Sequence, residues 1–96
     1  MEGTASVAGD VLASYAADAA REVEGVAGLV EGRLPRQGAV RINTDDGMTV
    51  ELHLELAPGA VAQHVGAEVQ RRVADYLEQM AGTRPRAVDV VIDEIA

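Results

Sequence analysis

The nine residues MTVELHLEL, Met48 to Leu56, constrain the fold more than any other stretch of the chain. Apolar side chains occupy every second position, and threonine, glutamate and histidine occupy the positions between them. Successive side chains of a β-strand point to opposite faces of a sheet, so this alternation predicts a strand with one buried and one wet face. Other elements of the chain must therefore cover its apolar face.

A shorter alternating run precedes this strand. In residues 40–43, valine and isoleucine alternate with arginine and asparagine, and Asp45-Asp46-Gly47 separates the two runs. A glycine-ended turn between two alternating runs is typical of a β-hairpin.

Two segments have the three-and-four spacing of apolar residues that is typical of helices. The first begins at Val7, and Gly25 is expected directly after its C-terminal cap. The second runs from about Ala60 to Ala81, and Gly82 is expected to end it. Residues 26–38 contain three glycines and a proline and are expected to form a loop.

A last alternating run, Ala87 to about Ile95, predicts a third strand, so the expected order is helix, strand, strand, helix, strand. Because the central strand offers only one apolar face, both helices must cover that face. This predicts a two-layer α+β domain with a three-stranded sheet and both helices on one face. Residues 7–96 are expected to form this single domain, and residues 1–6 a flexible N-terminal tail.

Charge and composition exclude several classes of function. The chain carries a net charge of −8 and has no cysteine, Phe or Trp. Disulfides and thiolate chemistry are therefore excluded, and an acidic surface argues against binding of DNA or of an anionic membrane. No apolar run is long enough to span a bilayer and no basic leader precedes an apolar stretch, so we expect a cytoplasmic protein without membrane insertion.

A GxxG tetrapeptide, Gly25 to Gly28, raises the alternative of a small KH-like RNA-binding domain, in which such a loop clamps the nucleic-acid backbone. Here Glu22 and Glu24 precede the glycines, and Val26 and Ala27 lie between them. A phosphate would meet repulsion and no counter-charge, so the sequence favours a structural role at a helix end and makes RNA an unlikely partner.

The sequence offers only weak candidates for a metal-binding or catalytic site. Glu51, His53 and Glu55 share one strand face, but ligands spaced along one strand lie ~6–7 Å apart and converge poorly without a cross-strand partner. Asn43, Asp45 and Gly47 resemble the start of a calcium loop, but Leu54 stands where the closing glutamate belongs. We expect no catalytic residues, no metal and no cofactor; a metal-dependent activity at His53 is a distant alternative.

The wet face of the sheet is the remaining candidate site. Two interpretations stay open: simple solvation, or an interface for self-association or a partner. An uncovered sheet edge could also be extended by another chain. The residues expected on this face are Arg41, Asn43, Glu51, His53, Glu55, Asp89, Val91 and Asp93, with Thr49 beside them.

The segment from Val7 to Gly28 resembles the N-terminal signature of the alkaline shock protein family of envelope stress response proteins. In that signature a helix ends in an E-V-x-G-V-x-G run. The matching residues are Glu22, Val23, Gly25, Val26 and Gly28.

Further motifs that resemble the family follow in order: D-G at the hairpin turn, a V-x-x-x-V-Q-x-x-V helix, an M-x-G helix end and a V-x-V-x-V strand. The residues that carry them are Asp46, Gly47, Val65, Val69, Gln70, Val73, Met80, Gly82, Val88, Val90, Ile92 and Ile95. The chain departs from the family pattern at two places. Tyr15 and Asp18 replace aliphatic residues in the first helix, and Ala57-Pro58-Gly59 replaces a Tyr-Gly pair after the second strand.

The resemblance implies a cytoplasmic, non-enzymatic protein concerned with cell-envelope homeostasis under stress. It also implies a homo-oligomer, since members of the family tend to self-associate. Some members are held near the membrane by a small membrane-anchored partner. The family supplies no catalytic residues, so the motif residues are expected to be structural.

Overall fold

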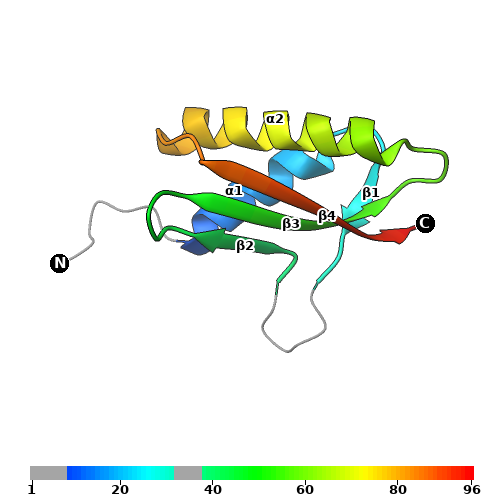
Figure 1. Cartoon of the computed structure of the whole chain (residues 1–96), viewed down its shortest axis with the longest axis horizontal. Coiled ribbons are helices and arrows are strands. Elements are labelled where there is room, and N and C mark those ends of the chain that lie inside the picture. Colours follow the sequence, from blue (N-terminus) through cyan, green and yellow to red (C-terminus); the bar gives the residue numbers. More distant parts are fainter. Residues whose placement is uncertain (1–8, 32–37) are drawn as a thin grey trace.

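The computed structural model describes residues 9–31 and 38–96 (Figure 1). The predicted tail, the start of the first helix at Val7 and residues 32–37 of the predicted loop lie outside the described residues. The elements are α1 (Gly9–Arg21), β1 (Val26–Leu29), β2 (Val40–Asn43), β3 (Thr49–Leu56), α2 (Ala62–Ala81) and β4 (Ala87–Ile95).

Strand β3 is the centre of a mixed four-stranded sheet. Strand β4 pairs with it in parallel along its whole length, from Thr49 to Leu56. Strand β2 pairs antiparallel with residues 49–52, and β1 pairs antiparallel with residues 54–56. Because β4 occupies one edge of β3 throughout, β1 and β2 lie end to end along its other edge.

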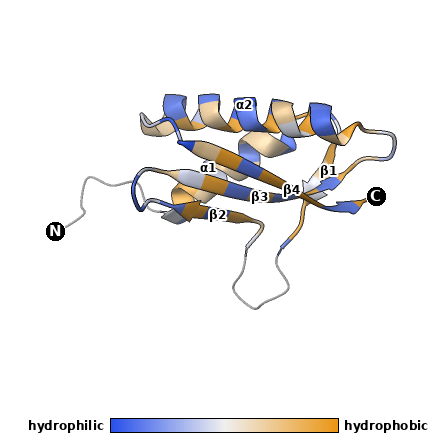
Figure 2. Cartoon of the chain, viewed as in Figure 1, coloured by the Kyte–Doolittle hydropathy of each residue, from blue (hydrophilic) through white to orange (hydrophobic). Residues whose placement is uncertain are grey.

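Both helices pack against the same face of this sheet. The alternate residues of β3 that face them are buried, and Leu52 and Leu54 have no exposed surface. The polar side of α2 points away from the sheet and its apolar side toward it (Figure 2). The buried apolar cluster is formed by Leu12, Ala16, Ala19, Ala20, Val23, Met48, Val50, Leu52, Leu54, Leu56, Val65, Val69, Val73, Ala74, Leu77 and Val88.

The α+β class is confirmed, but the sheet has four strands instead of three. Residues 26–29 were expected to form a loop and instead form β1. Val26 and Leu29 pack against the core, and their pairing with Leu56 and Leu54 satisfies the main chain of β3 beyond the end of β2. The glycines of the surrounding segment favoured the prediction of a loop, and this short strand was therefore not predicted.

The end of α1 also differs from the prediction. The helix ends at Arg21, four residues before Gly25, so Gly25 lies in the turn that leads into β1. Its φ of 100° requires glycine, and a Cβ atom there would lie 2.6 Å from Cγ2 of Val65. Gly25 thus allows the turn to touch the first turns of α2.

The end of α2 is confirmed at Gly82, whose φ is 77° and whose N–H donates to the Glu78 carbonyl at 2.9 Å. The helix begins at Ala62, two residues later than expected. The hairpin turn between β2 and β3 is also confirmed, with positive φ at Asp46 and Gly47.

Candidate functional site

The sheet face opposite the helices carries the residues that the sequence placed there. No described helix or strand covers this surface (Figures 1 and 2). We call it the open face; it comprises Arg41 and Asn43 of β2, Thr49, Glu51, His53 and Glu55 of β3, and Asp89, Val91 and Asp93 of β4. Neighbours on adjacent strands include Arg41 with Glu51, Glu51 with Asp89, and His53 with Val91.

His53 forms two side-chain hydrogen bonds on the open face. Its Nε2 lies 2.6 Å from Oε2 of Glu51, and its Nδ1 lies 2.7 Å from Oδ2 of Asp93. Its side chain is only 18% exposed. Both ring nitrogens can donate at once only when the imidazole is protonated, so this arrangement favours the imidazolium. We call the three residues the histidine clamp.

The clamp changes the acidity of His53. The hydrogen bond with Glu51 is the largest contribution and raises the pKa of His53, and the bond and charge of Asp93 act in the same direction. Partial burial opposes them because it disfavours the charged ring, but the net shift is upward.

A bulge in β4 brings Asp93 into the clamp. Leu54 pairs with Ile92, whereas Glu55 pairs with Glu94, so Asp93 is an extra residue between two paired positions. Bulges redirect side chains locally, and here Asp93 turns toward His53 of the neighbouring strand. The sequence placed Asp93 on the open face but did not predict its contact with His53, because strict alternation contains no signal for the bulge.

The structure does not bring Glu51, His53 and Glu55 together as one set. Glu51 and Asp93 bind opposite nitrogens of the His53 ring, so the two carboxylates do not converge on one point. Among residues 9–31 and 38–96, no group of three or more histidine, cysteine, aspartate or glutamate side chains could hold a metal ion.

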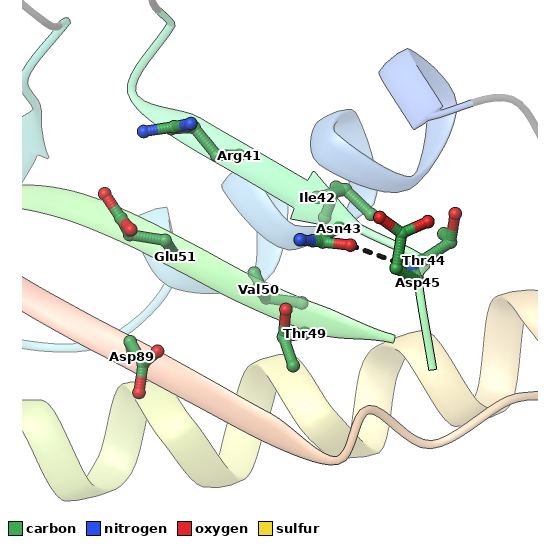
Figure 3. A pocket seen from close by; sticks show the side chains of 9 residues that line it. All are labelled: Arg41, Ile42, Asn43, Thr44, Asp45, Thr49, Val50, Glu51 and Asp89. Atoms are coloured by element: carbon green, nitrogen blue, oxygen red, sulfur yellow. Dashed lines mark hydrogen bonds between the residues drawn. The ribbon is translucent and has the colours of Figure 1, made fainter. Parts of the chain in front are cut away.

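The β2 end of the open face is hollowed. An open depression of about 440 Å³ lies over the start of β3 and is mainly polar (Figure 3). Within it the Asn43 side-chain oxygen accepts a hydrogen bond of 2.8 Å from the Asp45 N–H, which fixes the turn after β2. The lining residues are Arg41, Ile42, Asn43, Thr44, Asp45, Thr49, Val50, Glu51 and Asp89.

The depression presents charge of both signs. Figure 3 shows Arg41, Glu51 and Asp89 following one another across β2, β3 and β4. Such a row suits the charged or amide side chains of another polypeptide. The lining offers carboxylates and threonine hydroxyls but no cysteine, serine or histidine.

The GxxG segment is not a protruding loop. Gly25 lies in a turn packed against Val65 and Ala60, whereas Gly28 lies in β1 beside Glu55. Val23 is buried and Val26 is partly buried against the core. Glu22 is exposed at the end of α1. The premise of a KH-like clamp, a free loop between the two glycines, is therefore wrong.

A model of the alkaline shock protein family, described as having a cell envelope-related function, matches residues 1–96. The chain belongs to this family. The resemblance seen in the sequence is thereby confirmed.

Solved structures of similar fold are C-terminal domains of MamM. A manganese form has a TM-score of 0.56 at 15% identity and covers 88% of this chain and 96% of that one. A cadmium form has a TM-score of 0.57 at 16% identity and covers 88% of this chain and 94% of that one. At such identities the similarity concerns the fold alone. None of the curated proteins matches this chain.

Neither of the two described helices is long and apolar enough to cross a bilayer.

Proposed function

We propose that this alkaline shock protein is a non-enzymatic interaction module of the cell-envelope stress response, which acts in the cytoplasm by self-association and by binding a partner. The observation that carries the proposal is the open face: both helices fill one side of the sheet, and none of the described helices or strands covers the other. In the family context, a small membrane-anchored protein is the partner that would bring it to the membrane.

The chemistry of the open face supports binding better than catalysis. His53 is the one histidine among the described residues of this face, and carboxylates engage both of its ring nitrogens, which leaves neither nitrogen directed at a substrate. The mixed charges of Arg41, Glu51 and Asp89 instead suit recognition of another protein surface.

A nucleic-acid partner is not proposed. The net charge of −8 repels phosphate, and the GxxG segment is divided between a turn and a strand.

Self-association is tested by light scattering of the full chain over a range of concentrations. We expect the wild type to exceed the monomer mass, and Val91→Arg on the β4 side of the open face to return it to a monomer. Met80→Arg is the matched control because Met80 is an exposed apolar residue of α2, away from the open face. A wild type that stays monomeric at every concentration would refute the self-association.

A further inference from the structure

Strand β4 forms an edge of the sheet. Within the described part of the chain it pairs with β3 alone. An unpaired strand edge presents N–H and C=O groups that can accept a strand from another chain.

The hydrogen bond at the start of β4 indicates which groups face outward. Nε2 of Gln70, on α2, donates to the Val88 carbonyl at 2.9 Å. Main-chain groups alternate in direction along a strand, so Val90 and Ile92 direct their N–H and C=O groups to the same free edge. Gln70 therefore blocks one position and leaves the next two available.

The side chains beside this edge define the chemistry of a strand that would fit. On the open face, Asp89, Val91 and Asp93 follow one another, with an apolar side chain between two carboxylates. A strand added at the edge would place its own side chains directly beside these three. Complementarity requires a basic residue, an apolar residue and a second basic residue at alternate positions.

A second copy of β4 does not meet this requirement. If two copies paired antiparallel about Val91, Asp89 of each would lie opposite Asp93 of the other. Like charges placed opposite one another destabilise a strand pair, and each chain already carries a net charge of −8. The edge thus disfavours its own copy and suits a cationic segment of a different protein.

We propose that the free edge of β4, from Val90 onward, binds an extended basic segment of a partner protein by strand addition. The segment has the pattern basic, any, apolar, any, basic. The histidine clamp fixes Asp93 in position for one of the basic side chains. This inference rests on the proposed function, since it describes one partner of the same interaction module.

The test titrates the isotopically labelled full chain with the peptide STKTVTKTS and follows the backbone amide signals. We expect the largest shifts at Val90 and Ile92, and affinity that falls with added salt. The peptide STETVTETS, with glutamate in place of lysine, should not bind. A version of the lysine peptide with alternate N-methylated amides, which cannot pair along an edge, should also fail.

Matched variants test the charge requirement. Asp89→Asn with Asp93→Asn should weaken peptide binding about tenfold. Asp10→Asn with Glu24→Gln removes the same charge at exposed positions elsewhere and should leave binding unchanged. Thermal unfolding of each variant confirms that it remains folded.

The result that overturns the proposal is absence of binding, or equal binding of the N-methylated peptide. Absence of binding would mean that the carboxylates, the bulge and Gln70 only protect the edge. Light scattering of the same samples separates this failure from that of the proposed function: self-association without peptide binding overturns the edge site alone.

Discussion

At the scale of single residues, the histidine clamp links two strands through a partly buried imidazole on the open face. His53 binds carboxylates on two strands, Glu51 beside it on β3 and Asp93 across on β4. Alternation in the sequence placed all three residues on one face. It could not predict the contact with Asp93, because that contact depends on an extra residue in β4 opposite a regular β3.

The clamp predicts a pH dependence of stability. Because the folded state raises the pKa of His53, its contribution is complete below the ordinary value of 6.5 and is lost as pH rises through the folded pKa. In urea titrations, the free energy of unfolding of the wild type should therefore exceed that of His53→Gln most in mildly acidic solution below pH 6.5, and the difference should shrink as the pH rises into the alkaline range. Parallel stability curves for the two proteins would contradict the clamp.

The two glycines of the GxxG segment should respond differently to substitution. Gly25→Ala combines a positive φ with a Cβ atom 2.6 Å from Val65, so we expect a loss of about 2–3 kcal/mol in the free energy of unfolding. Gly28→Ala meets only the end of the Glu55 side chain at 3.9 Å and should cost less than about 1 kcal/mol. Equal losses in denaturant titrations would show that the two positions are equivalent.

At the scale of elements, the strands in which apolar and polar residues alternate could be predicted from the sequence. Strand β1, which lacks this alternation, was missed. Residues 48–56 place an apolar side chain at every second position, and the structure buries those side chains and no others of β3. Strand β1 has only four residues, and tertiary pairing with the second half of β3 stabilises it more than its own sequence does.

Substitutions at neighbouring residues of β3 should therefore have sharply different effects on the free energy of unfolding. Leu54→Asp places an unpaired charge among fully buried side chains and should cost several kcal/mol, about 3–5. Glu55→Ala, one position along on the open face, should change the free energy of unfolding by about 0.5 kcal/mol or less. Similar losses at both positions would mean that the faces of β3 are assigned the wrong way round.

Glu51→Ala is an intermediate case. Glu51 also lies on the open face, but it accepts a hydrogen bond from His53. We expect its removal to cost about 1 kcal/mol, and to do so only where His53 is charged.

At the scale of the whole molecule, the fold divides the chain into a packed side and an unoccupied side. The helices and the apolar face of the sheet form one core, and the open face takes no part in it. The family match attaches a cell envelope-related function to this architecture. In the described part of the chain one complete sheet face is left uncovered, and this is the observation on which the proposed assembly with other proteins rests.

Photo-crosslinking in cells of the native host tests this claim most directly. A photoreactive amino acid replaces Val91 on the open face in one strain and Met80 on α2 in a control strain. The account predicts chain-to-chain adducts, together with adducts of a membrane-anchored protein, from position 91 and not from position 80. Adducts from position 80 alone, or none from position 91, would contradict it.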